Sequence, residues 1–369
     1  MESPIYSYSL CVSLTLMLFF AFRFIFGTLP EVKNVDIYKQ SRSVMGLAMI
    51  ALSANYAVHL FVSPRNINPD YAIFMNLSTY FIASWLFSCA LMHLMVRGYL
   101  THKRFYRHIL FWIVYSVAFF GIYELQPNGE LRKISLVLMS LVFMTYSGVL
   151  AYRLFVALHR LRRMLDSYHS DNVYAYVRWM SVFTYWAIIF GVGQGVFTFI
   201  PTDYVYLWII SAIPFYIYTY VSYKNYIMFY EKVDKVNEEA VNEQSEESTM
   251  LSPTQDTVIS ERLEKWIADN GFTQNGLTIV DLAKTICTNR TYVSSYINNH
   301  YKMSFREWIN ELRLGYAKRL LIENPDMTIS DVAQAAGYMS LSYFTKTFNL
   351  SEGITPGKWR KSQVASSLL

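Results

Sequence analysis

Seven long apolar stretches in the first 230 residues constrain this chain more than any other feature of its sequence. They cover residues 7–26, 44–62, 71–96, 105–124, 134–158, 177–200 and 204–226. A helix needs roughly 20 consecutive apolar residues to cross a bilayer, which is about the length of these stretches. The sequence therefore predicts a seven-span membrane domain over residues 1–230. The first stretch is expected to be retained, because no basic segment precedes it and no small-residue cleavage motif follows it.

The connections between the stretches differ in charge, and this difference predicts their side of the membrane. The first, third and fifth connections, counted with the adjoining ends of the stretches, together carry 12 Lys and Arg, whereas the second, fourth and sixth carry 3. Short loops rich in Lys and Arg stay in the cytoplasm. Seven spans then put the N-terminus outside and the C-terminus in the cytoplasm.

Polar residues inside the apolar stretches leave two readings open. Asn55, Asn76 and Gln194 lie nearest to mid-membrane depth, where such side chains either join helices or line a ligand pocket. Gly191 and Gly195 have the spacing of a close helix contact. Ionisable groups are nearly absent deep in the spans, which argues against a proton or ion pathway.

A duplicated pattern marks the C-terminal part of the chain. Residues 278–283, Thr-Ile-Val-Asp-Leu-Ala, recur as Thr-Ile-Ser-Asp-Val-Ala at 328–333. In each copy the Thr can cap a helix, and the Asp three residues later can bond back to the amide of that Thr. Asn289 and Ser340 are then the expected N-caps of a second helix in each copy.

The second helices of the two copies have matching apolar positions, and a longer helix joins them. The matching positions are Tyr292, Val293 and Ile297 in the first copy and Tyr343, Phe344 and Phe348 in the second. Ser304 and Glu307 form the expected capping box of the joining helix, which ends at Asn324 before a proline. Its expected apolar stripe is Phe305, Ile309, Leu312, Tyr316 and Leu320.

Two helix-turn-helix units joined by one helix, followed by Gly-Ile-Thr-Pro at 353–356 and Trp-Arg at 359–360, resemble the AraC family of bacterial transcription regulators. The resemblance covers roughly the last hundred residues. It implies a DNA-binding domain over residues 259–369. The family usually has glycine where Cys287 stands, so the first turn is expected to form without a residue that adopts a positive φ freely.

The positions of the second helices that face away from the apolar side are the candidate DNA-reading residues. They are Arg290, Thr291, Ser294, Ser295 and Asn298 in the first unit, and Leu341, Ser342, Thr345, Lys346 and Asn349 in the second. A short helix with one apolar face leaves its other face free to lie in a major groove. The resemblance assigns phosphate contacts to Arg290, Lys302, Lys358 and Arg360, and base contacts to Thr291, Ser294, Ser295, Leu341, Ser342, Thr345 and Lys346.

An acidic segment, residues 231–258, separates the two parts of the chain. Residues 229–259 carry 8 Asp and Glu against 2 Lys. Such a polar stretch has too few apolar side chains to form a core, so it is predicted to be a tether. Ser260 is expected to cap an amphipathic helix over 261–270. The spacing of Phe229, Val233, Val236 and Ala240 also predicts that the seventh span extends into the first part of the tether.

These features predict an all-α protein with a seven-helix transmembrane bundle followed by a cytoplasmic double helix-turn-helix domain. We expect a one-component transcription regulator of the bacterial inner membrane that senses a signal through its membrane domain and binds specific duplex DNA. The expected partners are duplex DNA, inner-membrane lipid, RNA polymerase in the case of an activator, a second copy of the chain, and an unknown signal ligand or partner membrane protein.

Catalysis is not expected, since the sequence has no nucleophile–base constellation, metal-ligand cluster or phosphate loop in a suitable context. Neither a cofactor nor a metal is predicted, and Cys11, Cys89 and Cys287 are too far apart to indicate a disulfide framework. The competing hypothesis is a membrane transporter or enzyme for which the DNA-binding domain is an accessory switch.

Overall fold

The computed structural model describes residues 4–30, 35–125, 129–243 and 253–367. Within these ranges the regular elements are helices, without a β-strand, as the sequence predicts. Contacts divide the chain into two compact units. The seven-helix unit comprises Met1–Leu161 and Tyr176–Asn237, and the C-terminal unit comprises Arg162–Ala175 and Glu238–Leu369. The sequence did not predict that residues 162–175 group with the C-terminal residues.

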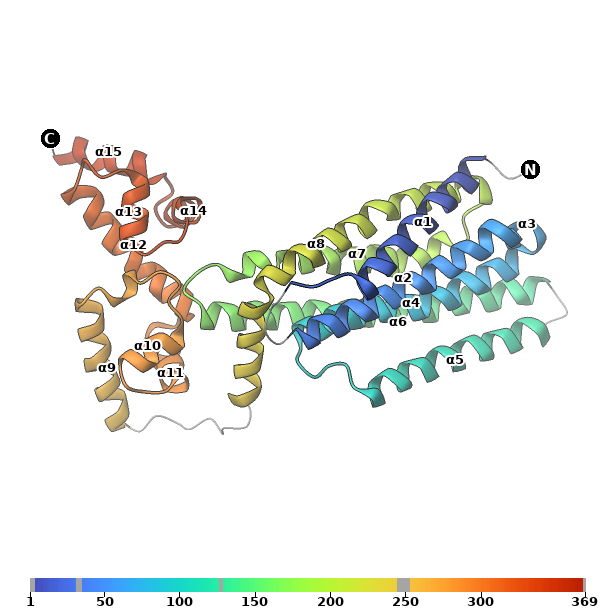
Figure 1. Ribbon diagram of the computed structural model, residues 1–369, viewed down its shortest axis with the longest axis horizontal. Helices are drawn as coiled ribbons and strands as arrows, with labels where there is room; N and C mark the ends of the chain where they lie inside the picture. Colours follow the sequence, from blue (N-terminus) through green and yellow to red (C-terminus); the bar gives the residue numbers. More distant parts are fainter. Residues whose placement is uncertain (1–3, 31–34, 126–128, 244–252, 368–369) are drawn as a thin grey trace. The chain divides into compact units, whose positions relative to one another are not determined.

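The seven-helix unit is built from long helices that run side by side (Figure 1). They are α1 (Pro4–Phe26), α2 (Asp36–Val62), α4 (Pro69–Met95), α5 (His102–Leu125), α6 (Gly129–Tyr168), α7 (Arg178–Phe197) and α8 (Thr202–Glu243), with a short α3 (Pro64–Ile67). Among the described residues, these seven long helices have the length and hydropathy needed to cross a membrane. Large apolar side chains such as Phe22 and Val117 stay exposed on them, as lipid contact would require.

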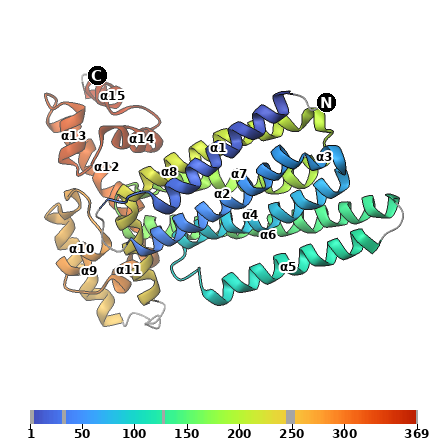
Figure 2. The ribbon, with the colours of Figure 1, turned by 45° about the vertical axis from the view of Figure 1, so that its right-hand side comes forward.

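Helix α4 is the most deeply packed of the seven and α5 the least. An 18-residue apolar stretch of α4 is 78% buried, whereas the corresponding stretch of α5 is 17% buried. Figure 2 shows α5 at the edge of the unit. Aromatic stacking joins α5 and α6 to α4. The ring centre of Phe81 on α4 lies 4.4 Å from that of Tyr115 on α5 and 4.1 Å from that of Tyr146 on α6.

Polar contacts also join the apolar helices. Asn55 Nδ2 on α2 donates a hydrogen bond to Asn76 Oδ1 on α4 over 3.1 Å, and His59 Nε2 lies 2.8 Å from the same oxygen. Both asparagines also line a small cavity of about 20 Å³. The hydrogen bonds show that these two residues join helices, whereas a cavity of this size holds about one water molecule, so a ligand pocket here stays a prediction.

The two glycines of α7 form the close helix contact that their spacing predicts. A Cβ atom on Gly191 would lie 2.9 Å from Ser147 Cβ, and one on Gly195 would lie 2.4 Å from Met144 Cγ. Ser140 Oγ donates to the carbonyl oxygen of Gly195 over 2.8 Å. This face of α7 is thus occupied by α6 of the same chain.

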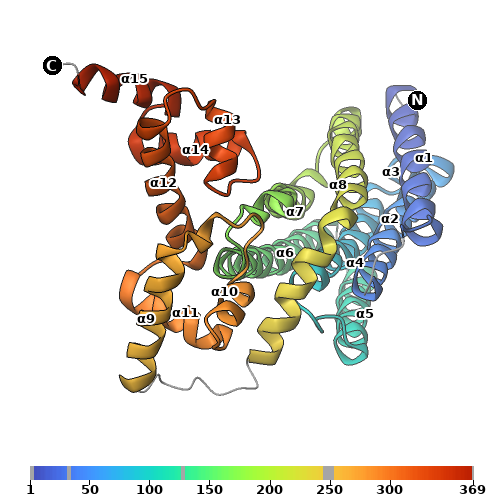
Figure 3. The ribbon, with the colours of Figure 1, turned by 60° about the vertical axis from the view of Figure 1, so that its left-hand side comes forward.

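The C-terminal unit consists of two helix-turn-helix pairs joined by one helix, and Figure 3 shows this joining helix, α12, between the pairs. The elements are α9 (Pro253–Ala268), α10 (Ile279–Thr285), α11 (Arg290–Tyr301), α12 (Phe305–Glu323), α13 (Ile329–Ala335), α14 (Leu341–Glu352) and α15 (Pro356–Ser367). The capping box of Ser304 and Glu307 begins α12, and α12 ends before Asn324, as predicted.

The buried face of α12 differs from the expected stripe. Phe305 and Ile309 are buried, but Leu312, Tyr316 and Leu320 are only half-buried. The fully buried positions further along are Arg313, Ala317 and Leu321. The expected stripe missed this face because it counted an arginine as exposed, whereas the Arg313 guanidinium bonds to backbone carbonyls inside the unit.

The acidic segment is helical at both ends. Helix α8 continues to Glu243, as the apolar spacing predicts, and α9 begins at Pro253. Ser260 therefore lies inside α9, and its prediction as an N-cap is wrong. Proline suits the first turn of a helix, and buried Ile259 adds an apolar contact before Ser260. The remainder of the predicted tether, 244–252, lies outside the described residues.

Candidate DNA-binding surface

The first helix of each helix-turn-helix pair begins at the predicted cap. Thr278 Oγ1 accepts a hydrogen bond from the amide of Asp281 over 3.2 Å, and Asp281 Oδ2 accepts one from the amide of Thr278 over 3.0 Å. In the second pair, Thr328 Oγ1 accepts from the amide of Asp331 over 3.1 Å. These caps fix the starts of α10 and α13.

The second helix of each pair also begins at the predicted cap. Asn289 Oδ1 accepts from the amide of Tyr292 over 2.9 Å, and Ser340 Oγ accepts from the amide of Tyr343 over 3.2 Å. A fixed start sets the angular position of every later residue, at about 100° per residue. The caps therefore decide which side chains of α11 and α14 face outwards.

The turns inside the two pairs have the same backbone conformation despite different residues. Cys287 has φ of 52° and Gly337 has φ of 85°. As expected, the first turn contains no glycine. Cys287 nevertheless adopts the left-handed conformation that glycine adopts freely. Arg262 Nη1 supports this turn by donating to the carbonyls of Ile286 over 2.8 Å and Cys287 over 3.0 Å.

The candidate reading residues lie opposite the buried faces of their helices. Val293 and Ile297 of α11 and Phe344 and Phe348 of α14 are fully buried. On α14, Leu341, Ser342, Lys346 and Asn349 are exposed and Thr345 is half-buried. Of the five candidates on α11, Asn298 is exposed, while Arg290, Thr291, Ser294 and Ser295 are half-buried. The outward face of α14 is thus more accessible than that of α11.

The residues that the resemblance assigned to phosphate differ in their surroundings. Lys302 and Lys358 are exposed. Arg360 Nη1 instead donates to the carbonyls of Pro325 over 2.9 Å and Met327 over 2.8 Å. This arginine therefore holds the connection between α12 and α13, as Arg262 holds the first turn.

Comparisons with known proteins agree with this geometry. A family profile described as a helix-turn-helix domain matches residues 282–362. The virulence regulon transcriptional activator VirF of Yersinia enterocolitica is 34% identical over 107 residues, which are 29% of this chain and 38% of VirF. The C-terminal domain belongs to the AraC family of helix-turn-helix domains.

Two further relatives match the same AraC-type domain. The transcriptional regulator ExsA of Pseudomonas aeruginosa is 35% identical over 24% of this chain and 32% of its own length. The melibiose operon regulatory protein of Escherichia coli is 30% identical over 26% of this chain and 31% of its own length. The chain thus spans about a third of these curated relatives. By name all three are regulators rather than enzymes, which agrees with a regulatory role for the matched domain.

Residues 162–175, which follow the apolar part of α6 and precede α7, pack against the AraC-type domain; we call them the docking segment. The amide of Ser170 donates to the carbonyl of Leu277 over 3.0 Å, and His169 pairs with Thr278 in an isolated antiparallel bridge. Leu277 and Thr278 directly precede α10. The docking segment therefore binds the backbone at the entrance of the first helix-turn-helix pair.

Two ion pairs hold the docking segment on α12. Asp166 Oδ1 lies 2.9 Å from Arg306 Nη1, and Asp171 Oδ1 lies 3.3 Å from Arg313 Nη1. Arg313 is fully buried and also donates to the carbonyls of Phe272 and Gln274, each over 2.8 Å. Burial lowers the pKa of this guanidinium, and the nearby Asp171 carboxylate opposes that shift. Asp171 thus supplies the counter-charge that a buried cation requires.

The docking segment also covers one candidate DNA contact. The guanidinium carbon of Arg290 lies 5.2 Å from the centre of the Tyr168 ring, within the range of a cation–π interaction. The assignment of Arg290 to phosphate stays a prediction. In this structure, however, an aromatic ring lies over that group.

Sequence reasoning missed Asp166, Tyr168 and Asp171, which carry these contacts. One signal was available, because both aspartates stand in a connection otherwise rich in arginine. Nothing local to the connection, however, names the distant arginines that they pair with.

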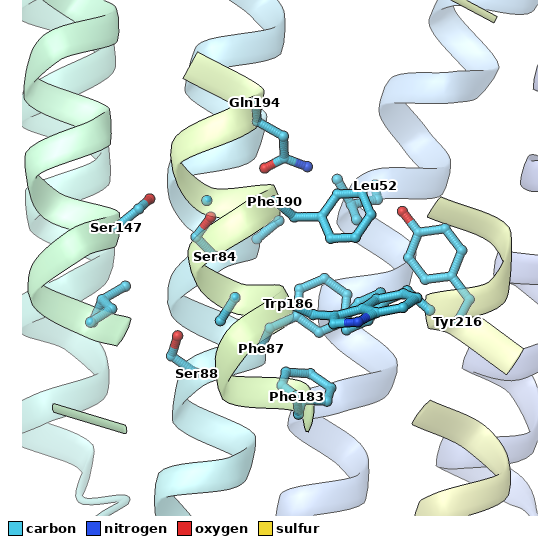
Figure 4. A pocket seen from close by; sticks show the side chains of 15 residues that line it. Leu52, Ser84, Phe87, Ser88, Ser147, Phe183, Trp186, Phe190, Gln194 and Tyr216 are labelled. Atoms are coloured by element: carbon cyan, nitrogen blue, oxygen red, sulfur yellow. The ribbon is translucent and has the colours of Figure 1, made fainter. Parts of the chain in front are cut away.

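The seven-helix unit has a separate cavity between its helices. It has a volume of about 50 Å³ and is walled by aromatic side chains such as Trp186 and Phe190. Figure 4 shows Ser84, Ser147 and Gln194 placing polar groups around it. Ser147 Oγ is buried and has no hydrogen-bond partner among the described residues. A cavity of this size suits a few water molecules or a small polar molecule.

Proposed function

We propose that this chain is a membrane-embedded, one-component transcription regulator whose AraC-type domain binds specific duplex DNA in the cytoplasm. Three features support the proposal: the family of the C-terminal domain, the seven apolar helices, and the charge of the connections, which predicts a cytoplasmic C-terminus. RNA polymerase and a second copy of the chain remain predicted partners.

The observation that carries the sensing part of the proposal is the docking segment. It is continuous in sequence with α6 and α7, yet Asp171 and Ser170 bind the AraC-type domain. A change in the α6–α7 pair would therefore act on the DNA-binding domain directly, without passing through the tether. A ligand can shift such an equilibrium only by binding one arrangement more tightly than the other.

In this proposal, the chain binds DNA more weakly while the docking segment is bound to the AraC-type domain. With Tyr168 over its guanidinium, Arg290 would have to leave the ring before it could contact a phosphate. Release of the docking segment frees that cation and with it one phosphate contact. Each phosphate neutralised by a protein cation changes the slope of log K against log salt by about 0.9 for B-DNA.

The test measures binding of the full chain in nanodiscs to a duplex selected from random sequences, over a series of salt concentrations. We expect Tyr168→Leu, which removes the aromatic face, to bind more tightly and to steepen the salt slope by about one phosphate equivalent. Tyr168→Phe keeps the ring and is the matched control. The double variant Tyr168→Leu with Arg290→Ala should lose the added slope.

Two results would contradict parts of the proposal. Equal salt slopes for the wild type and Tyr168→Leu would remove the masking role of Tyr168. Equal affinity of the wild type for the selected duplex and for random DNA at moderate salt would remove specific DNA binding altogether.

A further inference from the structure

The larger cavity of the seven-helix unit lies where α1 ends, α2 begins and α8 passes beside them. It has a volume of about 400 Å³, within the range of small-molecule sites. Its lining includes Arg23, Arg42 and Lys224 together with Tyr38, Tyr220 and Gly27. The charge of the connections predicts that this end of the helices faces the cytoplasm.

Three cations line this cavity, and no carboxylate of the described residues lines it with them. Residues 31–34, which follow the lining residue Pro30, lie outside the described residues. Among the described residues, none of the three forms an ion pair with an acidic side chain. Lys224 and Arg23 are exposed, whereas Arg42 is 8% exposed. Like charges gathered at a partly buried site repel one another, so an anion bound between them would lower the free energy of the site.

Protein contacts already hold the two guanidinium groups in place. Arg42 Nη2 donates to the carbonyls of Arg23 over 2.6 Å and Gly27 over 3.2 Å. Arg23 Nε donates to Tyr220 Oη over 3.3 Å. An arginine has five N–H donors, so these bonds leave other donors for a ligand. Groups fixed before binding lose less conformational entropy when a ligand arrives.

The cavity has an apolar side as well as a charged one. Phe24, Ile227 and Met228 line it beside the cations. A ligand with a phosphate group and an apolar chain would match both sides, and basic pockets between membrane helices at the cytoplasmic face suit anionic lipid headgroups.

We propose that this cavity is a binding site for a phosphate-bearing anion, held by Arg23, Arg42 and Lys224 at the predicted cytoplasmic end of the seven helices. The bonds of Arg42 to the end of α1 also have a structural role, so the exposed cations Arg23 and Lys224 provide the cleaner test. The site does not depend on DNA binding or on the docking segment.

The experiment is native mass spectrometry of the full chain released from detergent micelles. Phosphatidylglycerol and phosphatidylcholine with identical acyl chains are titrated in parallel, and inorganic phosphate is titrated alone. We expect at least tenfold tighter retention of phosphatidylglycerol than of phosphatidylcholine. The double variant Arg23→Gln with Lys224→Gln should lose most of this preference.

Lys39→Gln is the matched control, because Lys39 is an exposed cation of α2 that does not line the cavity. It should change retention by less than twofold. If inorganic phosphate binds with the same dependence on Arg23 and Lys224, the ligand is a soluble phosphate; if only the lipid binds, it is a headgroup. Equal retention of the two lipids without phosphate binding would overturn the site, as would equal losses in Lys39→Gln and the double variant.

Discussion

Asp171 Oδ1 lies 3.3 Å from Nη1 of the fully buried Arg313, so a residue from the connection between α6 and α7 supplies the counter-charge inside the AraC-type domain. Arg313 keeps two backbone acceptors without Asp171. We therefore expect Asp171→Ala to destabilise the C-terminal unit by roughly 1–3 kcal/mol, less than the 3–5 kcal/mol typical of a wholly uncompensated buried charge. Amide hydrogen exchange of α12 in the full chain would measure this, with the exposed Asp326→Asn as control. No faster exchange in Asp171→Ala would rule out the stabilising role of the pair.

The left-handed backbone that Cys287 and Gly337 share leads to a second prediction. A non-glycine residue pays about 1–2 kcal/mol for this conformation, and glycine loses more entropy on folding, so Cys287→Gly should stabilise the first pair by up to about 1 kcal/mol. Gly337→Ala should have the opposite effect, since its Cβ would lie 2.5 Å from the carbonyl oxygen of Thr273. Thermal unfolding of the full chain, followed by hydrogen exchange in α10 and α13, would compare them. A Cys287→Gly variant less stable than the wild type would disprove the strain.

The exposed position of Lys346 on α14 leads to a third prediction. Lys346→Ala should weaken binding to the selected duplex by about 1–3 kcal/mol and relax preference at one base pair, if the side chain reads a base. Binding to a set of duplexes with single base changes would measure this. Lys265→Ala on α9 removes the same charge from a position outside the predicted reading face. A uniform loss over all duplexes would make Lys346 a phosphate contact instead.

The continuation of α8 to Glu243 allows a test of coupling through the tether. Inserting one to four alanines after Val236 would rotate the following residues by about 100° per insertion. Promoter output that varies with helical phase would favour rigid transmission through α8. If the docking segment is the main route, as we propose, output should change little with phase but respond to Tyr168→Leu.

The predicted topology has its own test with reporters active only in the cytoplasm. Fusions after Arg42, Arg104, Arg163 or Tyr230 should be active, and fusions after Asn66 or Asn128 should be silent, because the odd connections carry the positive charge. An inactive fusion after Tyr230 would put the AraC-type domain out of reach of DNA, and the proposed function would then fail.

Local chemistry explains which parts of the fold could be predicted. Thr278, Asn289, Ser304 and Ser340 act as caps because the bonds involved span only three residues, so short patterns specify them. The seven long helices were equally predictable from length and hydropathy alone. The DNA contacts of the ten candidate reading residues remain predictions, because such contacts form only in a complex with DNA.

What the sequence could not predict depends on residues far apart in the chain. The burial of Arg313 follows from carbonyls about forty residues earlier and from Asp171, more than a hundred residues earlier. Without those partners, an arginine in an amphipathic pattern is predicted to be exposed. The early start of α9 was missed for a related reason, because Ser260 resembles a cap although buried Ile259 extends the helix before it.

The length of α6 has a mechanical consequence. Helix α6 is unbroken over the 40 residues Gly129–Tyr168, which corresponds to roughly 60 Å at about 1.5 Å per residue. The apolar layer of a bilayer is only about 30 Å thick, so about half of the helix is surplus to crossing it. Such a helix acts as a lever: a tilt of about 10°, well within the range of membrane helices, would carry its far end through roughly 5 Å. A small change of tilt would therefore become a displacement of several ångströms at the docking segment, which begins in this end of the helix and includes Asp166.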